Sequence, residues 1–164
     1  MLRIIDIFLA SLAIIIFLPL ITFIYFLIYF ENKSPIFRQT RIGKNMTKFT
    51  LIKFRTMNIG TESLATHLID NSKITILGSI LRKTKLDELP QLWNVLKGDM
   101  SLVGPRPCLP SQSELINIRK KYQLYKYLPG ITGLAQINGI DMSDPLLLAN
   151  TDYRMMNNLN LKIH

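Results

Sequence analysis

The sequence is poor in the side chains on which many enzymes depend. It contains one cysteine, Cys108, so a disulfide within the chain is impossible, which suits a reducing cytoplasm. Its two histidines, His67 and His164, lie far apart without metal-ligand spacing, and we expect both at the surface. Neither a P-loop nor a Gly-x-Gly-x-x-Gly turn occurs, so any bound nucleotide must be held in another way.

Acidic residues are also few. The chain has 11 of them against 20 lysines and arginines, which gives a net charge of +9 over 164 residues, and this length predicts one domain. A basic protein can bind nucleic acid, but the sequence contains no recognisable nucleic-acid-binding motif. We therefore expect no nucleic-acid partner, and the oligomeric state is not indicated by the sequence.

Charge is absent from residues 7–30, which are almost entirely apolar. A membrane-spanning helix needs roughly 20 apolar residues, so this segment is long enough. It is too long for the apolar core of a signal peptide, and no small-x-small cleavage site follows it. We predict a retained membrane segment over residues 1–31 and a cytoplasmic domain over residues 32–164.

Pro19 interrupts the middle of the apolar segment. A proline inside a helix removes one hydrogen bond and costs about 3 kcal/mol in water. It produces either a kink in a spanning helix or a break that returns the chain to the side it entered. Basic residues follow the segment and place that side in the cytoplasm: Lys33, Arg38, Arg41, Lys44 and Lys48. A spanning helix would put the N-terminus outside, whereas a re-entrant helix would keep both ends inside.

The remainder of the chain predicts an α+β fold that is mainly α-helical. Residues 36–40 and 48–57 are rich in β-branched and aromatic side chains and flank a glycine-containing turn, which predicts a β-hairpin. Lys53 and Arg55 alternate with apolar residues, so they share one face, either solvated or available to an anion. Short helices are predicted at residues 74–81 and 88–96.

A further helix is predicted after Pro110. Ser111 and Glu114 have the spacing of a capping box, and a narrow apolar stripe follows between basic residues. Such a helix either covers a protein core or lies on an anionic membrane surface.

Asp87 and Glu88 are adjacent carboxylates at the predicted start of the 88–96 helix. They can serve as a helix cap, because the N-terminus of a helix favours negative charge. Alternatively, they can bind Mg²⁺ or attack phosphorus. Arg106 lies between two prolines that restrict its backbone, and an arginine matches two phosphate oxygens at once. Lys53, Arg55 and Arg82 can supply further positive charge.

Several sequence blocks resemble those of one known family. The run LDELPQLWNVLKGDMSLVGPRP (86–107), with KFRTM (53–57) and PGITGLAQINGI (129–140), looks like the signature of the bacterial sugar transferases, the monotopic phosphoglycosyl transferases. Arg3 and Asp6 before the apolar segment also fit this family. The resemblance covers nearly the whole chain, and the blocks occur in the family's order.

The resemblance implies a reaction at the bacterial inner membrane. A sugar 1-phosphate passes from a UDP-sugar to a polyprenol phosphate, UMP leaves, and assembly of a polysaccharide or glycoconjugate begins. Asp87 would be the nucleophile that forms a covalent phosphosugar intermediate, Glu88 would assist, and Mg²⁺ would bind at Asp87. The substrate-binding residues implied by position and charge are Lys53, Arg55, Arg82, Arg106 and Asp152. The family's membrane helix is re-entrant, which favours a break at Pro19.

Two departures from the family pattern bear on these expectations. Leu18 precedes Pro19 where the family usually has serine, so a hydroxyl that could satisfy a freed backbone group is missing. The sequence also ends at His164, where family members usually continue through a further amphipathic segment. The alternative to an active transferase is therefore a non-catalytic, membrane-anchored partner protein that retains the motifs. The sequence does not identify the sugar.

Overall fold

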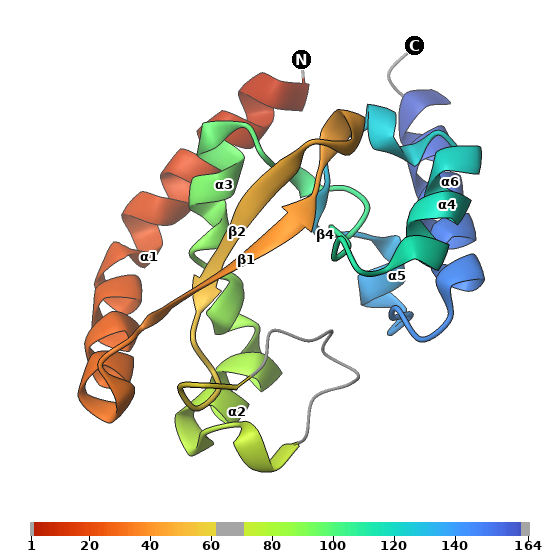
Figure 1. The fold of residues 1–164 in the computed structure, drawn as a ribbon. Coiled ribbons are helices and arrows are strands. Elements are labelled where there is room, and N and C mark those ends of the chain that lie inside the picture. The colour runs from red at the N-terminus through yellow and green to blue at the C-terminus, as the bar shows by residue number, and fades with distance from the viewer. Residues whose placement is uncertain (1, 62–70, 162–164) are drawn as a thin grey trace. The chain divides into compact units, whose positions relative to one another are not determined.

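The computed structural model describes residues 2–61 and 71–161, which are mainly helical with small sheets, as the sequence predicts (Figure 1). The chain forms two compact units. The first contains residues up to Gln39 together with Thr50–Gly98, and the second contains Thr40–Phe49 together with residues from Asp99 onward. The domain boundary predicted at residue 31 stays a prediction. His67 and His164 lie outside the described residues.

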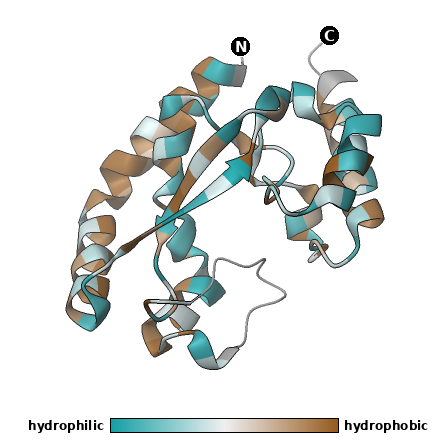
Figure 2. Cartoon of the chain, viewed as in Figure 1, coloured by the Kyte–Doolittle hydropathy of each residue, from teal (hydrophilic) through white to brown (hydrophobic). Residues whose placement is uncertain are grey.

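Helix α1 (Leu2–Asn32) carries the apolar segment and is continuous through Pro19. Over Arg3–Asn32 it is long and apolar enough to cross a membrane, and 11% of its most apolar stretch is buried. Figure 2 shows the hydrophobic residues along it. The predicted break at Pro19 is not seen. The turn around the proline has an additional hydrogen bond, because the Thr22 hydroxyl donates to the Leu18 carbonyl at 2.9 Å.

Both ends of α1 contact other elements of the first unit. Near its start, Nη2 of Arg3 donates to the carbonyl of Leu96 at 3.1 Å, in the last turn of α3 (Gln91–Lys97). Near its end, Ile24 and Ile28 are buried in a small hydrophobic core. The other buried members of that core are Phe54 and Leu81.

The predicted hairpin is present. Strands β1 (Ile36–Ile42) and β2 (Lys48–Phe54) pair around a 3-10 turn, η1 (Lys44–Met46). Asn94 of α3 is fully buried against β2, where its side-chain oxygen accepts from the Ile52 amide at 3.0 Å and its side-chain nitrogen donates to the Thr50 carbonyl at 2.8 Å. The Asn94 side chain thus forms hydrogen bonds with backbone groups of β2 that do not bond to β1.

Helix α2 (Ile76–Thr84) follows the short turn η3 (Asn71–Lys73) and lies very close to the chain beyond β2. Its N-cap is Thr75, whose hydroxyl accepts from the Gly78 amide at 2.9 Å. A Cβ at Gly78 would come within 2.1 Å of the Thr56 carbonyl oxygen, so only glycine permits this approach. The helix begins two residues later than the sequence predicts.

The predicted helix 88–96 is divided in the structure. Lys85 adopts a left-handed conformation (φ 59°) that ends α2, a 3-10 turn, η4 (Leu86–Glu88), follows, and α3 begins only after Pro90. The expectation that Asp87 stands at a helix N-terminus is therefore wrong, because Asp87 lies inside η4. Pro90 explains the division, since it has no N–H and occupies the N-cap position of α3.

The second unit contains a parallel strand pair and a helical layer. Strand β3 (Ser101–Val103) pairs with β4 (Gly130–Thr132) so that Ser101 lies opposite Gly130 and Val103 opposite Thr132. The helical elements are α4 (Ser113–Lys121), η5 (Leu124–Lys126), α5 (Leu134–Ile137) and α6 (Pro145–Leu161).

Helix α4 covers the core of the second unit. Leu115 and Ile116 are buried there together with residues of α6, so the apolar stripe belongs to the protein core. The predicted capping box does not form, because the helix begins at Ser113 with Gln112 as its N-cap. The Gln112 side-chain oxygen accepts instead from the Leu109 amide at 2.8 Å.

Candidate functional site

The centre of the candidate site is the turn η4, which connects α2 to α3 and carries Asp87 and Glu88. Asp87 is buried, with 5% of its surface exposed. Its Oδ1 atom has no hydrogen-bond partner among the described residues. A buried carboxylate oxygen without a partner is unfavourable for the free protein, and this arrangement is typical of sites that await a ligand.

The environment of Asp87 combines burial with surrounding charge. Burial raises the pKa of the Asp87 carboxyl above its usual value, and the neighbouring Glu88 raises it further. Lys53, Arg82 and Lys85 act in the opposite direction and lower this pKa, but they do not outweigh the burial. Three cations from β2, α2 and the residue after α2 thus surround one carboxylate.

Arg82 is held in a defined position. Its Nε donates to the side-chain oxygen of Thr56 at 2.8 Å, and burial lowers its pKa while the charge of Asp87 raises it. The Thr56 hydroxyl therefore fixes one edge of the guanidinium group. Thr56 and Arg82 belong to two different sequence blocks, and the fold brings them together at Asp87.

Lys53 and Arg55 share one face, as their spacing predicts. Their charged groups lie 5.5 Å and 5.6 Å from the centre of the Phe37 ring. The two residues differ in their other partners. Lys53 acts on the pKa of Asp87, whereas Nε of Arg55 donates to the carbonyl of Ser34 at 2.8 Å. The first unit thus brings Lys53 and Arg82 to the carboxylate pair, and Arg55 is engaged in holding the start of β1.

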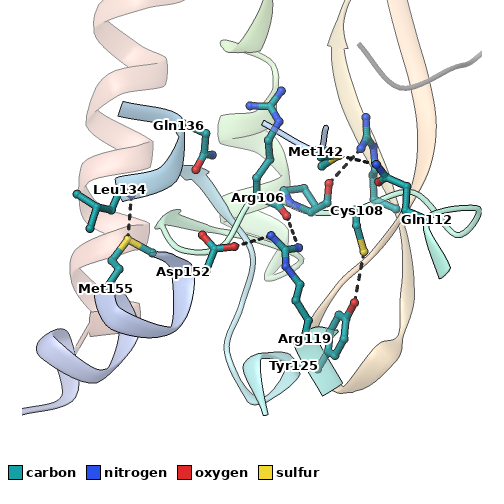
Figure 3. Close-up of polar contacts among 12 residues, drawn as sticks. Arg106, Cys108, Gln112, Arg119, Tyr125, Leu134, Gln136, Met142, Asp152 and Met155 are labelled. Atoms are coloured by element: carbon teal, nitrogen blue, oxygen red, sulfur yellow. Dashed lines mark hydrogen bonds and ion pairs between the residues drawn. The ribbon is translucent and has the colours of Figure 1, made fainter. Parts of the chain in front are cut away.

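Arg106 and Asp152 belong to the second unit. The backbone of Arg106 is fixed by a buried side chain, because Nη1 of Arg119 donates to its carbonyl at 2.6 Å. Nη1 of Arg41 donates to the next carbonyl, that of Pro107, at 3.0 Å. Figure 3 shows the side chain of Arg106 pointing away from Arg119.

Asp152 lies on α6 and is completely buried. Its Oδ2 atom is 2.5 Å from Nη2 of Arg119, in an ion pair that both residues bury (Figure 3). Burial raises the pKa of Asp152, and Arg119 counteracts this rise. The role predicted from sequence, binding of substrate, stays a prediction, but the carboxylate observed here is engaged by a protein side chain.

The sequence interpretation missed several residues of this arrangement. Lys85 and Thr56 were not among the predicted site residues, although both lie within or beside the matching blocks. Arg119 is one of the basic residues that flank the predicted apolar stripe of its helix, yet only 2% of it is exposed. A signal for its burial exists in the sequence, because it follows the buried Leu115 by four residues and therefore shares its helix face.

A divalent cation fits the residues at Asp87. No group of three or more histidine, cysteine, aspartate or glutamate side chains could hold a metal within residues 2–61 and 71–161, so a complete protein cage is absent there. Mg²⁺ does not require such a cage, since it usually binds one or two carboxylates together with substrate phosphate oxygens. The unpartnered Oδ1 of Asp87, with the Glu88 carboxylate beside it, suits this type of binding.

Comparison with known proteins gives a consistent result. The family model described as "Bacterial sugar transferase" matches residues 1–163. An uncharacterized sugar transferase of Haemophilus influenzae is 40% identical over 154 residues, which cover 84% of this chain and 32% of that protein. The UDP-glucose:undecaprenyl-phosphate glucose-1-phosphate transferase of Caulobacter vibrioides is 40% identical over 143 residues, which cover 84% of this chain and 54% of that protein. The exopolysaccharide production protein ExoY of Rhizobium meliloti is 39% identical over 152 residues, which cover 82% of this chain and 67% of that protein. The chain thus spans from a third to two thirds of the length of these relatives.

Proposed function

The chain belongs to the bacterial sugar transferase family, and on that premise we propose that it transfers a sugar 1-phosphate from a UDP-sugar to a membrane polyprenol phosphate, with release of UMP. The environment of Asp87 is the observation that carries the proposal. This carboxylate is buried, has an unpartnered oxygen among the described residues, and stands in the field of three cations. The name of the Caulobacter relative, which specifies a UDP-sugar and undecaprenyl phosphate, supports the class of both substrates.

The proposed reaction has two steps at one phosphorus atom. A carboxylate oxygen of Asp87 attacks the sugar-bearing phosphorus of the UDP-sugar, and the bond from that phosphorus to the bridging oxygen breaks, so that UMP leaves with the electron pair. A phosphate oxygen of the polyprenol phosphate then attacks the same phosphorus. The bond to Asp87 breaks, which restores the carboxylate and yields a polyprenol diphosphate sugar. Glu88 accepts a proton from the lipid phosphate when that group is protonated.

The cations around Asp87 have a defined task in this scheme. The diphosphate of the substrate and the carboxylate are both negative, so they repel one another unless positive charge lies between or beside them. Lys53, Arg82 and Lys85 already act on Asp87 and would also neutralise the incoming diphosphate. Asp87, with Glu88 beside it, would hold Mg²⁺, which neutralises charge on the diphosphate and on the leaving UMP.

Helix α1 supplies access to the lipid substrate. Apolar side chains are exposed along most of its length, and Ile4, Phe8, Ile15 and Phe30 have 65% or more of their surface exposed. Such a surface is stable within lipid and unfavourable in water. We propose that α1 associates with the inner membrane at its cytoplasmic face and so places the catalytic unit beside the headgroup of the polyprenol phosphate.

The test uses the full chain, purified in a detergent or nanodisc, with Mg²⁺ and a panel of UDP-sugars but no lipid acceptor. The expected result is a burst of UMP that does not exceed one equivalent, together with a protein mass increased by one phosphosugar. Asp87→Asn should lose both signals, whereas Asp144→Asn, at an exposed aspartate, should keep them.

Two results would contradict the proposal in different ways. UMP release that strictly requires the lipid, without a covalent adduct, would exclude the two-step mechanism. An absence of turnover with every UDP-sugar, even with polyprenol phosphate present, would favour the non-catalytic partner protein, which no observation at this stage supports.

A further inference from the structure

The turn Pro105–Pro107 in the second unit and Cys108, which follows it, have a hydrogen-bond donor at each of their four carbonyls. The two outer bonds come from the backbone, since the Gly130 amide donates to the Pro105 carbonyl and the Ile42 amide donates to the Cys108 carbonyl, each at 3.0 Å. The two inner carbonyls are those of Arg106 and Pro107. They accept instead from side chains.

These two inner bonds come from buried guanidinium groups. Arg119 donates to the Arg106 carbonyl at 2.6 Å, and Arg41 donates to the Pro107 carbonyl at 3.0 Å. Arg119 and Arg41 have 2% and 5% of their surface exposed. Buried guanidinium groups as main-chain donors are costly, because each carries a charge away from water. Their presence on consecutive carbonyls indicates that the position of this turn matters.

The charge of Arg119 is balanced by Asp152. The carboxylate reaches Nη2 of Arg119 at 2.5 Å, while Nη1 of the same group serves the Arg106 carbonyl. Because the guanidinium is planar, fixing one nitrogen fixes the direction of the other. The orientation of Asp152 on α6 therefore sets the orientation of the Arg106 backbone, 46 positions earlier in the chain.

We propose that Asp152 is a positioning residue for the transfer reaction, which acts through Arg119 to hold the backbone of Arg106 and does not itself contact substrate. The proposal rests on the proposed function and on the sequence prediction that Arg106 binds a substrate phosphate. Figure 3 shows the geometry that supports it: Asp152 is directed at Arg119, Arg119 is directed at the carbonyl of Arg106, and the Arg106 side chain points away from both.

A fixed backbone affects binding more than chemistry. An arginine that grips phosphate oxygens at two points must be oriented correctly, and a mobile backbone loses more conformational freedom when it binds. Release of the turn should therefore weaken binding of the UDP-sugar. The chemical step at Asp87 should change little once the substrate is bound.

The first experiment measures KM and kcat for UDP-sugar with Asp152→Asn in the full membrane-embedded chain. We expect KM to rise about tenfold, from the loss of one oriented charge-assisted contact, with kcat within about twofold. Asp144→Asn, the same substitution at an exposed residue preceding the same helix, should change neither constant. A lower amount of active enzyme with an unchanged KM would overturn the proposal, because that result indicates a structural role only.

A double-mutant cycle identifies the route. If Asp152 acts through Arg106, Asp152→Asn should add nothing to the KM effect of Arg106→Ala, since the side chain to be positioned is gone. If Asp152 contacts substrate directly, its full effect should persist in the Arg106→Ala background, and the proposal is then wrong.

A second variant separates the loss of positioning from a loss of stability. Asp152→Asn leaves the Arg119 charge buried without a counter-charge, which is strongly destabilising. Arg119→Met combined with Asp152→Leu removes both charges and the bond to the Arg106 carbonyl while keeping the site apolar and filled. This pair should retain the Tm of the parent protein and still show the raised KM. A normal KM in this well-folded variant would overturn the proposal.

Cys108 provides a readout that does not depend on activity. It is the only cysteine, follows the turn directly and is fully buried. Loosening of the turn in Asp152→Asn or in the double variant should raise its alkylation rate about tenfold, whereas Asp144→Asn should not. If the parent protein releases no UMP, the proposed function fails. If the alkylation rate is unchanged in both variants, the positioning role fails, whatever the activity.

Discussion

The Nε of Arg82 donates a 2.8 Å hydrogen bond to the side-chain hydroxyl oxygen of Thr56 and thereby joins α2 to the chain beyond β2. The same contact region contains a backbone bond, from the Thr75 amide to the Thr56 carbonyl at 3.2 Å. Thr56 thus bonds the N-cap residue of the helix through its main chain and Arg82 of the candidate site through its side chain. The positive charge of Arg82 also acts on Asp87, where it lowers the pKa of the carboxyl.

Removal of the Thr56 hydroxyl should impair the site more than the fold. Thr56→Val keeps the shape of the side chain but leaves Nε of Arg82 without its acceptor, and we expect a stability loss of about 1 kcal/mol. UMP release should fall about tenfold, because a misdirected cation stabilises the transition state less well. Thr47→Val, which removes an exposed hydroxyl bonded to Lys44, is the matched control. An unchanged rate in Thr56→Val would mean that this hydrogen bond does not position Arg82.

Gly78 should tolerate no side chain. Alanine is favoured over glycine in a helix by about 1 kcal/mol, so Gly78→Ala in an ordinary helix would stabilise the protein. Here the new Cβ would lie 2.1 Å from the Thr56 carbonyl oxygen, and α2 must move. We expect a net loss of about 2 kcal/mol or more in denaturant unfolding followed by circular dichroism. Ser79→Ala, one residue later, should change stability little, and an equally stable Gly78→Ala would refute the close approach.

The burial of Asp87 should make the stability of the protein depend on pH. Because the pKa of Asp87 is raised, the folded protein holds its proton more tightly than the unfolded chain does. The stability that this group contributes is present below the ordinary pKa of an aspartate and is lost as the pH rises through the raised pKa.

Asp87→Asn cannot ionise, so in metal-free buffer at pH 7.5 its Tm should exceed that of the parent protein by about 2–5 °C. The difference should shrink as the pH falls toward about 4, near the ordinary value for aspartate. Asp144→Asn, at an exposed carboxylate, is the control for removal of one negative charge. A parent protein that is more stable than Asp87→Asn at pH 7.5 would show that the surrounding cations outweigh burial.

The elements that could be predicted from sequence are those with a strong local pattern. The apolar run of α1, the alternation in the hairpin and Gly98, which ends α3 in a left-handed conformation, each determine a structure through residues close in the chain. The carboxylate pair and the cations Lys53 and Arg82 could be predicted as one site, because sequence blocks resembling a family carry them.

The features that escaped prediction depend on distant partners or on backbone conformation. The left-handed conformation of Lys85 places Asp87 in a 3-10 turn and not at a helix start, and no periodicity indicates it. The burial of Arg119 requires a carboxylate 33 residues away. The continuous path of α1 through Pro19 is likewise not recorded by a hydropathy pattern.

The contacts at the two ends of α1 predict the topology of the N-terminus. Arg3 bonds to Leu96 of α3, and Ile28 packs in the core that contains Phe54, so both ends of α1 contact the same unit. We expect a cysteine added at the N-terminus, in a Cys108→Ser background, to react with an impermeant maleimide only when the cytoplasmic face is open. Lys83→Cys, on the exposed surface of α2, should label from the same side and serves as the reference. Labelling of the N-terminal cysteine in intact cells would require α1 to span the membrane, and the bond between Arg3 and Leu96 could then not exist.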